Sequence, residues 1–133
     1  MKVTSYEHAC ELLNLNPAEI KPDFSMVPER HRLAMEKHFE MVIIAQAINR
    51  DEETGEDWNP NWDDYSERKW RPWFDLEKDE DNNPSGFRFD GSNYAYTNAI
   101  SAGGSRLCFK TEKDSNYAGE TFIDHYRAMM VIE

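Results

Sequence analysis

The 133-residue sequence is poor in cysteine, in long apolar runs and in segments that could direct export. Its two cysteines, Cys10 and Cys108, form neither a CxxC pair nor a Cys/His zinc spacing, so we expect reduced, buried thiols. No apolar run approaches the roughly 18 residues that a membrane span requires, and the first residues do not resemble a signal peptide. These absences predict a soluble, cytoplasmic protein that does not contact a membrane.

Basic residues are also scarce, and one segment lacks them altogether. The 15 Lys and Arg residues stand against 26 Asp and Glu residues, which gives a net charge of −11. Residues 51–67 contain eight acidic residues and no basic residue, so most of the surplus lies there. Because binding to a phosphate backbone requires clustered Lys and Arg, nucleic acid is a disfavoured partner. The charge instead favours a cationic partner or the imitation of a polyanion.

The sequence does contain enough apolar bulk for one core. Seven Phe, six Tyr and four Trp residues supply it, and a chain of this length fits a single domain, which we place at residues 1–133. Apolar residues at helical spacing predict a long helix from Glu29 to Asn49. Its second half carries apolar side chains on nearly every face. We therefore expect this helix to be buried at the centre and covered on two or three sides.

Further helices are predicted at the two ends of the chain. Thr4 or Ser5 caps a first helix that ends before Pro17, and residues 17–20 form a short turn. Thr111 or Asp114 opens a C-terminal helix with an apolar stripe along one side.

Three strands are predicted between the long helix and the C-terminal helix. The period of two indicates a first strand at 69–76, with Pro72 at an edge or a bulge because proline cannot donate to the ladder. A second strand starts at 87–90, is interrupted at 91–93 and can resume at 94–97, and a third lies at 105–110. Three successive strands indicate an antiparallel meander. The fold class is therefore α+β, with N-terminal helices, a three-stranded antiparallel meander and a C-terminal helix.

Most of the excess of acidic over basic residues lies in the segment between the long helix and the first predicted strand. Residues 51–67, which we call the acidic aromatic loop, also hold Trp58, Trp62 and Tyr65. Disordered acidic linkers are normally poor in aromatic residues. We therefore predict an ordered surface loop whose aromatic side chains hold it in place.

Three stretches carry a family resemblance. They are Asp57–Trp62, Trp70–Asp75, and Gly104–Lys110 followed by Tyr117–Gly119 and Phe122–Asp124. Together they resemble a family of small, functionally uncharacterised proteins encoded by phages and mobile elements of anaerobic gut bacteria. The resemblance covers most of the chain, and its most specific part is the stretch before the terminal helix. It implies a phage-linked role inside a host cell, and it transfers no catalytic residue.

The candidate metal sites do not match known ligand spacings. His31 and His38 share a helix face, but seven residues separate them by about 10.5 Å along the axis, which is too far for one metal ion. Residues 79–90 resemble a calcium loop, but Pro84 replaces the required glycine and Asp90 is short for the last ligand. Surface histidines and a solvated turn are the better interpretations. We predict no metal and no cofactor.

A catalytic site has equally little support. A nucleophilic site would use Cys108 with His125, oriented by Asp124, but nothing in the sequence indicates a lowered thiol pKa. An acidic cluster at Asp63, Asp64 and Glu67 is better explained as a solvated face. We predict that the protein is not an enzyme.

The outer face of the sheet is a candidate binding surface. If Trp70 and Phe74 face the core, alternation places Arg71 and Trp73 outside. These side chains form either a structural ladder across the strands or a platform on which single-stranded nucleic acid stacks. The residues that we predict to bind a partner are Trp58, Trp62, Arg71, Trp73 and Arg106.

The predicted function follows from this surface and from the acidic aromatic loop. We predict a non-catalytic, phage-derived interaction protein that binds a protein partner, or itself, through the loop and the outer sheet face. The predicted acidic surface comprises Asp51, Glu52, Glu53, Glu56, Asp57, Asp63 and Asp64. Two alternatives stay open. One is an anti-defence protein that imitates DNA and inhibits a host nucleic-acid-binding protein, and the other is a protein that binds single strands by stacking.

Overall fold

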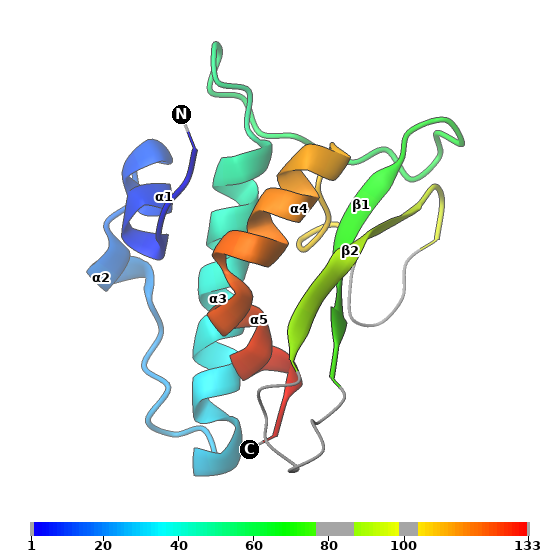
Figure 1. Cartoon of the computed structure of the whole chain (residues 1–133). Coiled ribbons are helices and arrows are strands. Elements are labelled where there is room, and N and C mark those ends of the chain that lie inside the picture. Colours follow the sequence, from blue (N-terminus) through cyan, green and yellow to red (C-terminus); the bar gives the residue numbers. More distant parts are fainter. Residues whose placement is uncertain (1, 77–86, 99–103, 133) are drawn as a thin grey trace.

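The computed structural model describes residues 2–76, 87–98 and 104–132, and the described part has an α+β fold. Its elements in chain order are α1 (Tyr6–Leu12), α2 (Pro17–Ile20), α3 (Glu29–Asn49), β1 (Lys69–Asp75), β2 (Arg88–Ala95), α4 (Glu112–Thr121) and α5 (Ile123–Met130). Figure 1 shows them in layers: α1 and α2 lie on one side of α3, while α4 and α5 lie between α3 and the sheet. No helix of the described residues is both long and apolar enough to cross a membrane.

Side-chain caps begin two of the helices where the sequence places them. The hydroxyl of Ser5 accepts a hydrogen bond from the N–H of His8 at 3.0 Å, and that of Thr111 accepts one from Asp114 at 3.0 Å. The predicted C-terminal helix is divided at Phe122, whose backbone leaves helical geometry (φ −108°, ψ 31°) and ends α4. The Phe122 side chain is buried, so the break directs an aromatic ring into the core.

The long helix α3 has the predicted bounds, but only its second half is buried. Its buried residues are Glu40, Met41, Ile44, Ala45, Ala47 and Asn49. In the first half, Leu33 is 58% and Met35 is 50% exposed, so burial is confined to the second half, the part on which the expectation of a buried helix rested. The physical reason is that α1, α4 and α5 cover the C-terminal part, whereas the N-terminal end of α3 extends past them (Figure 1).

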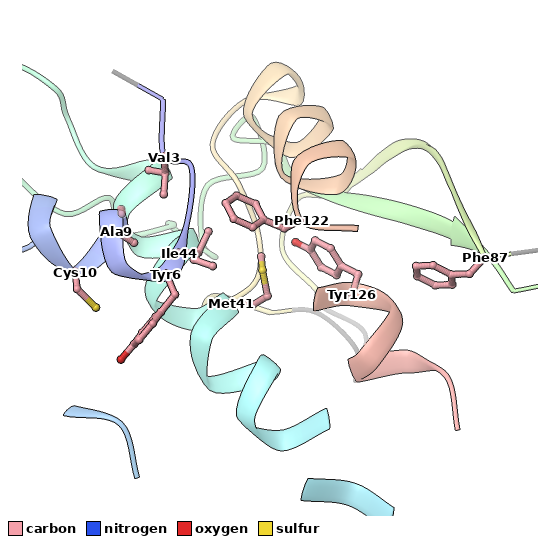
Figure 2. Packing of buried hydrophobic residues seen from close by; sticks show 10 residues of the cluster. Val3, Tyr6, Ala9, Cys10, Met41, Ile44, Phe87, Phe122 and Tyr126 are labelled. Carbon is pink, nitrogen blue, oxygen red and sulfur yellow. The ribbon is translucent and has the colours of Figure 1, made fainter. Parts of the chain in front are cut away.

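The main core forms where α1, α3 and α5 meet. Figure 2 shows Tyr6 and Ala9 of α1 near Met41 and Ile44 of α3, with Tyr126 of α5 on the other side. Burial of these side chains is the main source of stability in such a core, at roughly 25 cal/mol per Å² of apolar surface.

The sheet contains two strands, and the predicted third strand is not confirmed. β1 and β2 pair antiparallel, with Trp70 opposite Tyr94 and Phe74 opposite Phe89. The register shifts between Pro72 and Phe74, and Gly91, with φ of +77°, adopts the backbone conformation that the extra residue of β2 requires.

The segment predicted as the third strand makes only a single bridge to β1. Trp70 and Phe109 exchange backbone hydrogen bonds of 2.9 and 2.7 Å. Two residues further along the same edge of β1, Pro72 has no N–H to donate, so the ladder cannot continue as it began. Residues 105–107 form a turn instead.

Helix α4 approaches the sheet closely at Gly119. A Cβ atom at this position would lie 2.5 Å from the ring of Phe89 and 2.9 Å from the Cβ of Pro72. Glycine therefore allows the helix to lie directly against both strands.

Candidate functional site

A buried lysine fastens the acidic aromatic loop to the outer face of the sheet. Lys69 begins β1 and is only 1% exposed. Its Nζ donates to the carbonyl oxygens of Asn61 at 2.5 Å, Glu67 at 3.0 Å and Tyr96 at 2.6 Å. A buried ammonium group is tolerated only when such acceptors replace its water. The interaction therefore holds residues 61–67 in a defined conformation against β1.

Trp62 connects the loop to a distant turn. Its ring centroid lies 5.3 Å from the Nζ of Lys69, a cation–π contact. Its indole N–H donates to the hydroxyl of Ser105 at 2.5 Å. The loop is therefore fixed both to the strand and to the turn at residues 104–107, as the prediction of an ordered loop requires.

Three of the predicted binding residues meet at this place. Trp58 and Arg106 line an open pocket of about 390 Å³ with Val42 and Gln46 of α3, and Trp62 is tied to the adjacent Ser105. The side chain of Gln46 donates to the carboxylate of Asp57 at 3.0 Å, which attaches the loop to α3. Arg106 is exposed, whereas Trp58 and Trp62 are half-buried.

The other two predicted binding residues lie on β1. Trp73 is 47% exposed and Arg71 is half-buried, and both line a second pocket with Leu107 and residues of α5. Leu107 of this pocket directly follows Arg106 of the first, so both pockets include residues of one turn. Four of the five predicted residues line these two pockets, and Trp62 is connected to the first through Ser105.

The acidic side chains point to solvent. Asp51, Glu52, Glu53, Glu56, Asp57 and Asp63 are exposed, and Asp64 is half-buried. Hydrogen bonds from the backbone N–H groups of Thr54 and Glu53 hold the pKa of Asp51 below its usual value. The hydroxyl and the N–H of Ser66 do the same for the pKa of Asp64. Both carboxylates therefore stay charged at neutral pH while they shape the loop.

Figure 1 shows the first part of the loop projecting beyond the C-terminal end of α3. It places the acidic residues that follow α3 at one end of the molecule.

An arginine–aromatic ladder does cross the two strands, although Arg68 supplies its arginine. The Cζ of Arg68 lies 4.7 Å from the ring centroid of Tyr94, and its Nε donates to the hydroxyl of Tyr96 at 3.2 Å. Trp70 meets Tyr94 edge to face, with ring centroids 4.9 Å apart. These rings contact one another and Arg68, which favours the structural interpretation over a stacking platform.

Cys108 and His125 have separate partners. The thiol of Cys108 donates to the carbonyl oxygen of Ser105 at 3.8 Å, and burial raises its pKa to about 11. His125 instead hydrogen-bonds through Nε2 to the carboxylate of Glu40 at 2.9 Å. A thiol with a raised pKa is a poor nucleophile at neutral pH.

Sequence reasoning missed the charged network around Glu40. This carboxylate is 5% exposed in the middle of α3 and binds Lys21 at 2.8 Å as well as His125. Burial alone would raise its pKa, but the hydrogen bonds from Lys21 and His125 outweigh burial and lower it. The available signal was a lone glutamate within an apolar run, which requires a charged partner if the run is buried.

Most of the calcium-like turn at residues 79–90 lies outside the described residues. In the part of the chain that the structure describes, no three His, Cys, Asp or Glu side chains are grouped as metal ligands.

Comparison with known proteins identified no relative of this chain. No protein family, curated protein or solved structure matches the chain. The resemblance to a phage-encoded family therefore stays a prediction.

Proposed function

We propose that this is a non-catalytic interaction protein that binds a protein partner, or a second copy of itself, through the acidic aromatic loop and the adjoining outer face of β1. The observation that carries the proposal is the burial of Lys69. Its ammonium group donates to four carbonyl oxygens, those of Asn61, Asp64 and Glu67 in the loop and that of Tyr96 just after β2, and so joins the loop and the outer face into one continuous surface. A preorganised surface loses less conformational entropy on binding than a mobile acidic segment would.

The composition of this surface suits a partner with basic residues. The carboxylates of Glu53, Glu56 and Asp63 are exposed and make no side-chain hydrogen bond or ion pair within the described residues. Trp73 and Arg106 add exposed side chains of types that are enriched at binding hot spots. Carboxylates steer a basic partner toward the loop, and the aromatic side chains supply contact area.

The same carboxylates also support the imitation of DNA as a second candidate. Fixed, unpaired carboxylates on one segment reproduce the charge of a phosphate backbone. In this case the partner is a nucleic-acid-binding protein. Single-strand binding has less support, because the rings of Trp70, Tyr94 and Tyr96 contact one another and Arg68.

Affinity capture with matched charge variants tests the proposal. The immobilised protein is incubated with cell lysate at low and moderate salt, with and without nuclease. The variant E53Q/E56Q/D63N removes three loop charges whose carboxylates have no hydrogen bond or ion pair to any described residue. The control E11Q/E19Q/E120Q removes three exposed charges elsewhere on the surface.

We expect a basic protein that the wild type and the control capture and the loop variant does not. Retention after nuclease, together with displacement by added DNA, indicates imitation of DNA. If capture requires nucleic acid and survives loop neutralisation, the proposal is wrong and single-strand binding is favoured. If the wild type and both variants capture the same proteins, the loop is not the binding surface.

A further inference from the structure

The outer face of β1 carries charges of both signs around an exposed aromatic side chain. Phe74 packs against Tyr126 on the inner face, so alternation places Arg71, Trp73 and Asp75 on the outer one. Trp73 is 47% exposed and lies midway between one positive and one negative residue, each two positions away. Residues 51–67, in contrast, contain only acidic charges. A second copy of this acidic chain therefore meets less repulsion here than at the acidic aromatic loop.

An apolar pocket adjoins Trp73. It has a volume of about 190 Å³ and includes Leu107 of the turn and Met129 of α5. Residues of both faces of β1 line it, so it lies at the edge of the strand, and none of the described residues that line it is acidic. An engineered apolar cavity of roughly 150 Å³ binds benzene, so the pocket has room for one aromatic ring. The same patch thus holds an exposed aromatic side chain and a space that fits one.

The two charged side chains beside Trp73 differ in their bonding. Asp75 binds Arg88 at 2.8 Å. The Arg71 side chain makes no ion pair and no hydrogen bond to any described residue, and only its Nε is closed to solvent. Its Nη groups can therefore reach an acceptor outside the chain. A carboxylate has about four acceptor sites, so Asp75 of a second molecule can bind Arg71 without releasing its own Arg88.

We propose that two copies of the chain associate face to face through β1, related by a two-fold axis near Trp73. Such a contact requires a patch that is complementary to itself. Antiparallel placement of the two strands about Trp73 brings Arg71 of each copy opposite Asp75 of the other, and the indole ring of each copy to the pocket of the other. One strand of seven residues gives a contact below the standard size, so the dimer is weak and dissociates on dilution.

This inference rests on the proposed function, because it names a second copy as the molecule that binds the outer face of β1. A basic partner suits this face less well, since the carboxylate of Asp75 already binds Arg88. The acidic aromatic loop of each copy stays available for a basic partner.

Sedimentation equilibrium of the isolated full chain tests the proposal, at protein concentrations from about 10 µM to 1 mM and at about 0.15 M salt, which screens the net charge. We expect a reversible monomer–dimer equilibrium. Trp73→Thr should weaken it by about tenfold or more, because the aromatic anchor is lost. Tyr65→Thr, at an exposed aromatic residue of the loop, is the control and should leave the dissociation constant unchanged. A wild type that stays monomeric, or equal association of the two variants, would overturn the proposal.

Charge exchange tests the antiparallel arrangement and still decides if Trp73→Thr does not fold. R71E and D75R each place like charges opposite one another at both contacts, and each should weaken its own dimer by about tenfold or more. A mixture of the two variants restores opposite charges at both contacts. The mixed dimer should therefore form with about the affinity of the wild type. A purely structural role of these residues does not predict this rescue, and its absence would overturn the proposal.

Dimerisation and affinity capture can fail separately. The variant E53Q/E56Q/D63N should dimerise like the wild type, because the loop is not part of the contact. A monomeric protein whose loop still captures a basic protein would overturn this inference and leave the proposed function standing. A dimer that Trp73→Thr abolishes, in a protein that captures nothing, would support this inference and refute the binding of a basic partner by the loop.

Discussion

At the scale of single residues, Lys69 has an environment that alternation alone does not predict. Its place in β1 puts the side chain on the outer face, where a lysine is normally solvated. The loop instead folds over it and supplies acceptors at 2.5 to 3.3 Å from Nζ. The hydrogen bonds of the ammonium group thus connect strand β1 to a loop that has no regular secondary structure.

We expect Lys69→Met to lower the free energy of unfolding by about 2–4 kcal/mol, because part-buried carbonyl oxygens lose their donor and Glu67 loses its charged partner. Urea unfolding measures the loss. The amide protons of residues 61–67 should exchange faster in this variant. Lys113→Met, at an exposed lysine, is the control and should change stability by less than about 0.5 kcal/mol. Equal stability of the two variants would show that Lys69 does not hold the loop.

Gly119 allows a second prediction at this scale. Helix propensity alone favours Gly119→Ala by about 1 kcal/mol. Overpacking opposes it by about 1–3 kcal/mol, since the new Cβ would lie 2.9 Å from Pro72, whose ring cannot rotate away. We expect a net loss of stability in urea unfolding. Glu120→Ala, at the exposed neighbour, should be neutral or slightly stabilising. Stabilisation by Gly119→Ala would show that α4 and the sheet are not closely packed.

At the scale of elements, Glu40 links three parts of the chain. It joins α3 to His125 of α5 and to Lys21, which follows α2. Because its pKa is lowered in the folded state, the unfolded state binds more protons when the medium is acidified. The stabilising contribution of Glu40 is therefore complete above its ordinary pKa of 4.5 and is lost as the pH falls through the lowered value.

We expect the free energy of unfolding to fall as the pH drops below about 4.5. Glu40→Gln should be less stable than the wild type at neutral pH, by about 3–5 kcal/mol if the cations are left without their carboxylate. The difference between the two proteins should narrow on acidification. A difference that is constant with pH would show that the carboxylate charge does not contribute.

The elements differ in how well the sequence predicts them. The bounds of α3 and the cap at Ser5 follow from local patterns of polarity and hydrogen bonding, which the chain carries wherever it folds. The segment 105–110 has the alternation of a strand, but forming one requires a partner edge. Pro72 interrupts that edge after the bridge between Trp70 and Phe109. The sequence of residues 105–110 alone does not show whether a free edge of another strand will be available to pair with it.

The candidate site shows the same limit. The sequence indicates that Trp58, Trp62 and Arg106 are candidate residues, but it does not show that Ser105 accepts from Trp62 across 43 positions of the chain. Nor does it show that Asp75 binds Arg88 while Arg71 has no carboxylate partner among the described residues. Residue type is local, whereas pairing depends on the folded arrangement.

At the scale of the whole molecule, the acidic aromatic loop combines a high density of negative charge with a fixed conformation. The acidic aromatic loop contains eight of the 26 acidic residues, and contacts with Lys69, Ser105 and Gln46 hold it in place. We propose that both properties are needed for binding: the charges attract a basic partner, and the fixed loop presents them together with the adjoining face of β1.

The most direct test of this claim is affinity capture with Lys69→Met, performed where amide NMR shows that the variant is folded. Lys69 is 1% exposed and cannot contact a partner, so it affects binding only through the loop. We predict that the partner captured by the wild type and by Lys113→Met is lost or reduced about tenfold or more with Lys69→Met, as it is with E53Q/E56Q/D63N. Undiminished capture by a folded Lys69→Met protein with a mobile loop would contradict the account, because charge without order would then suffice.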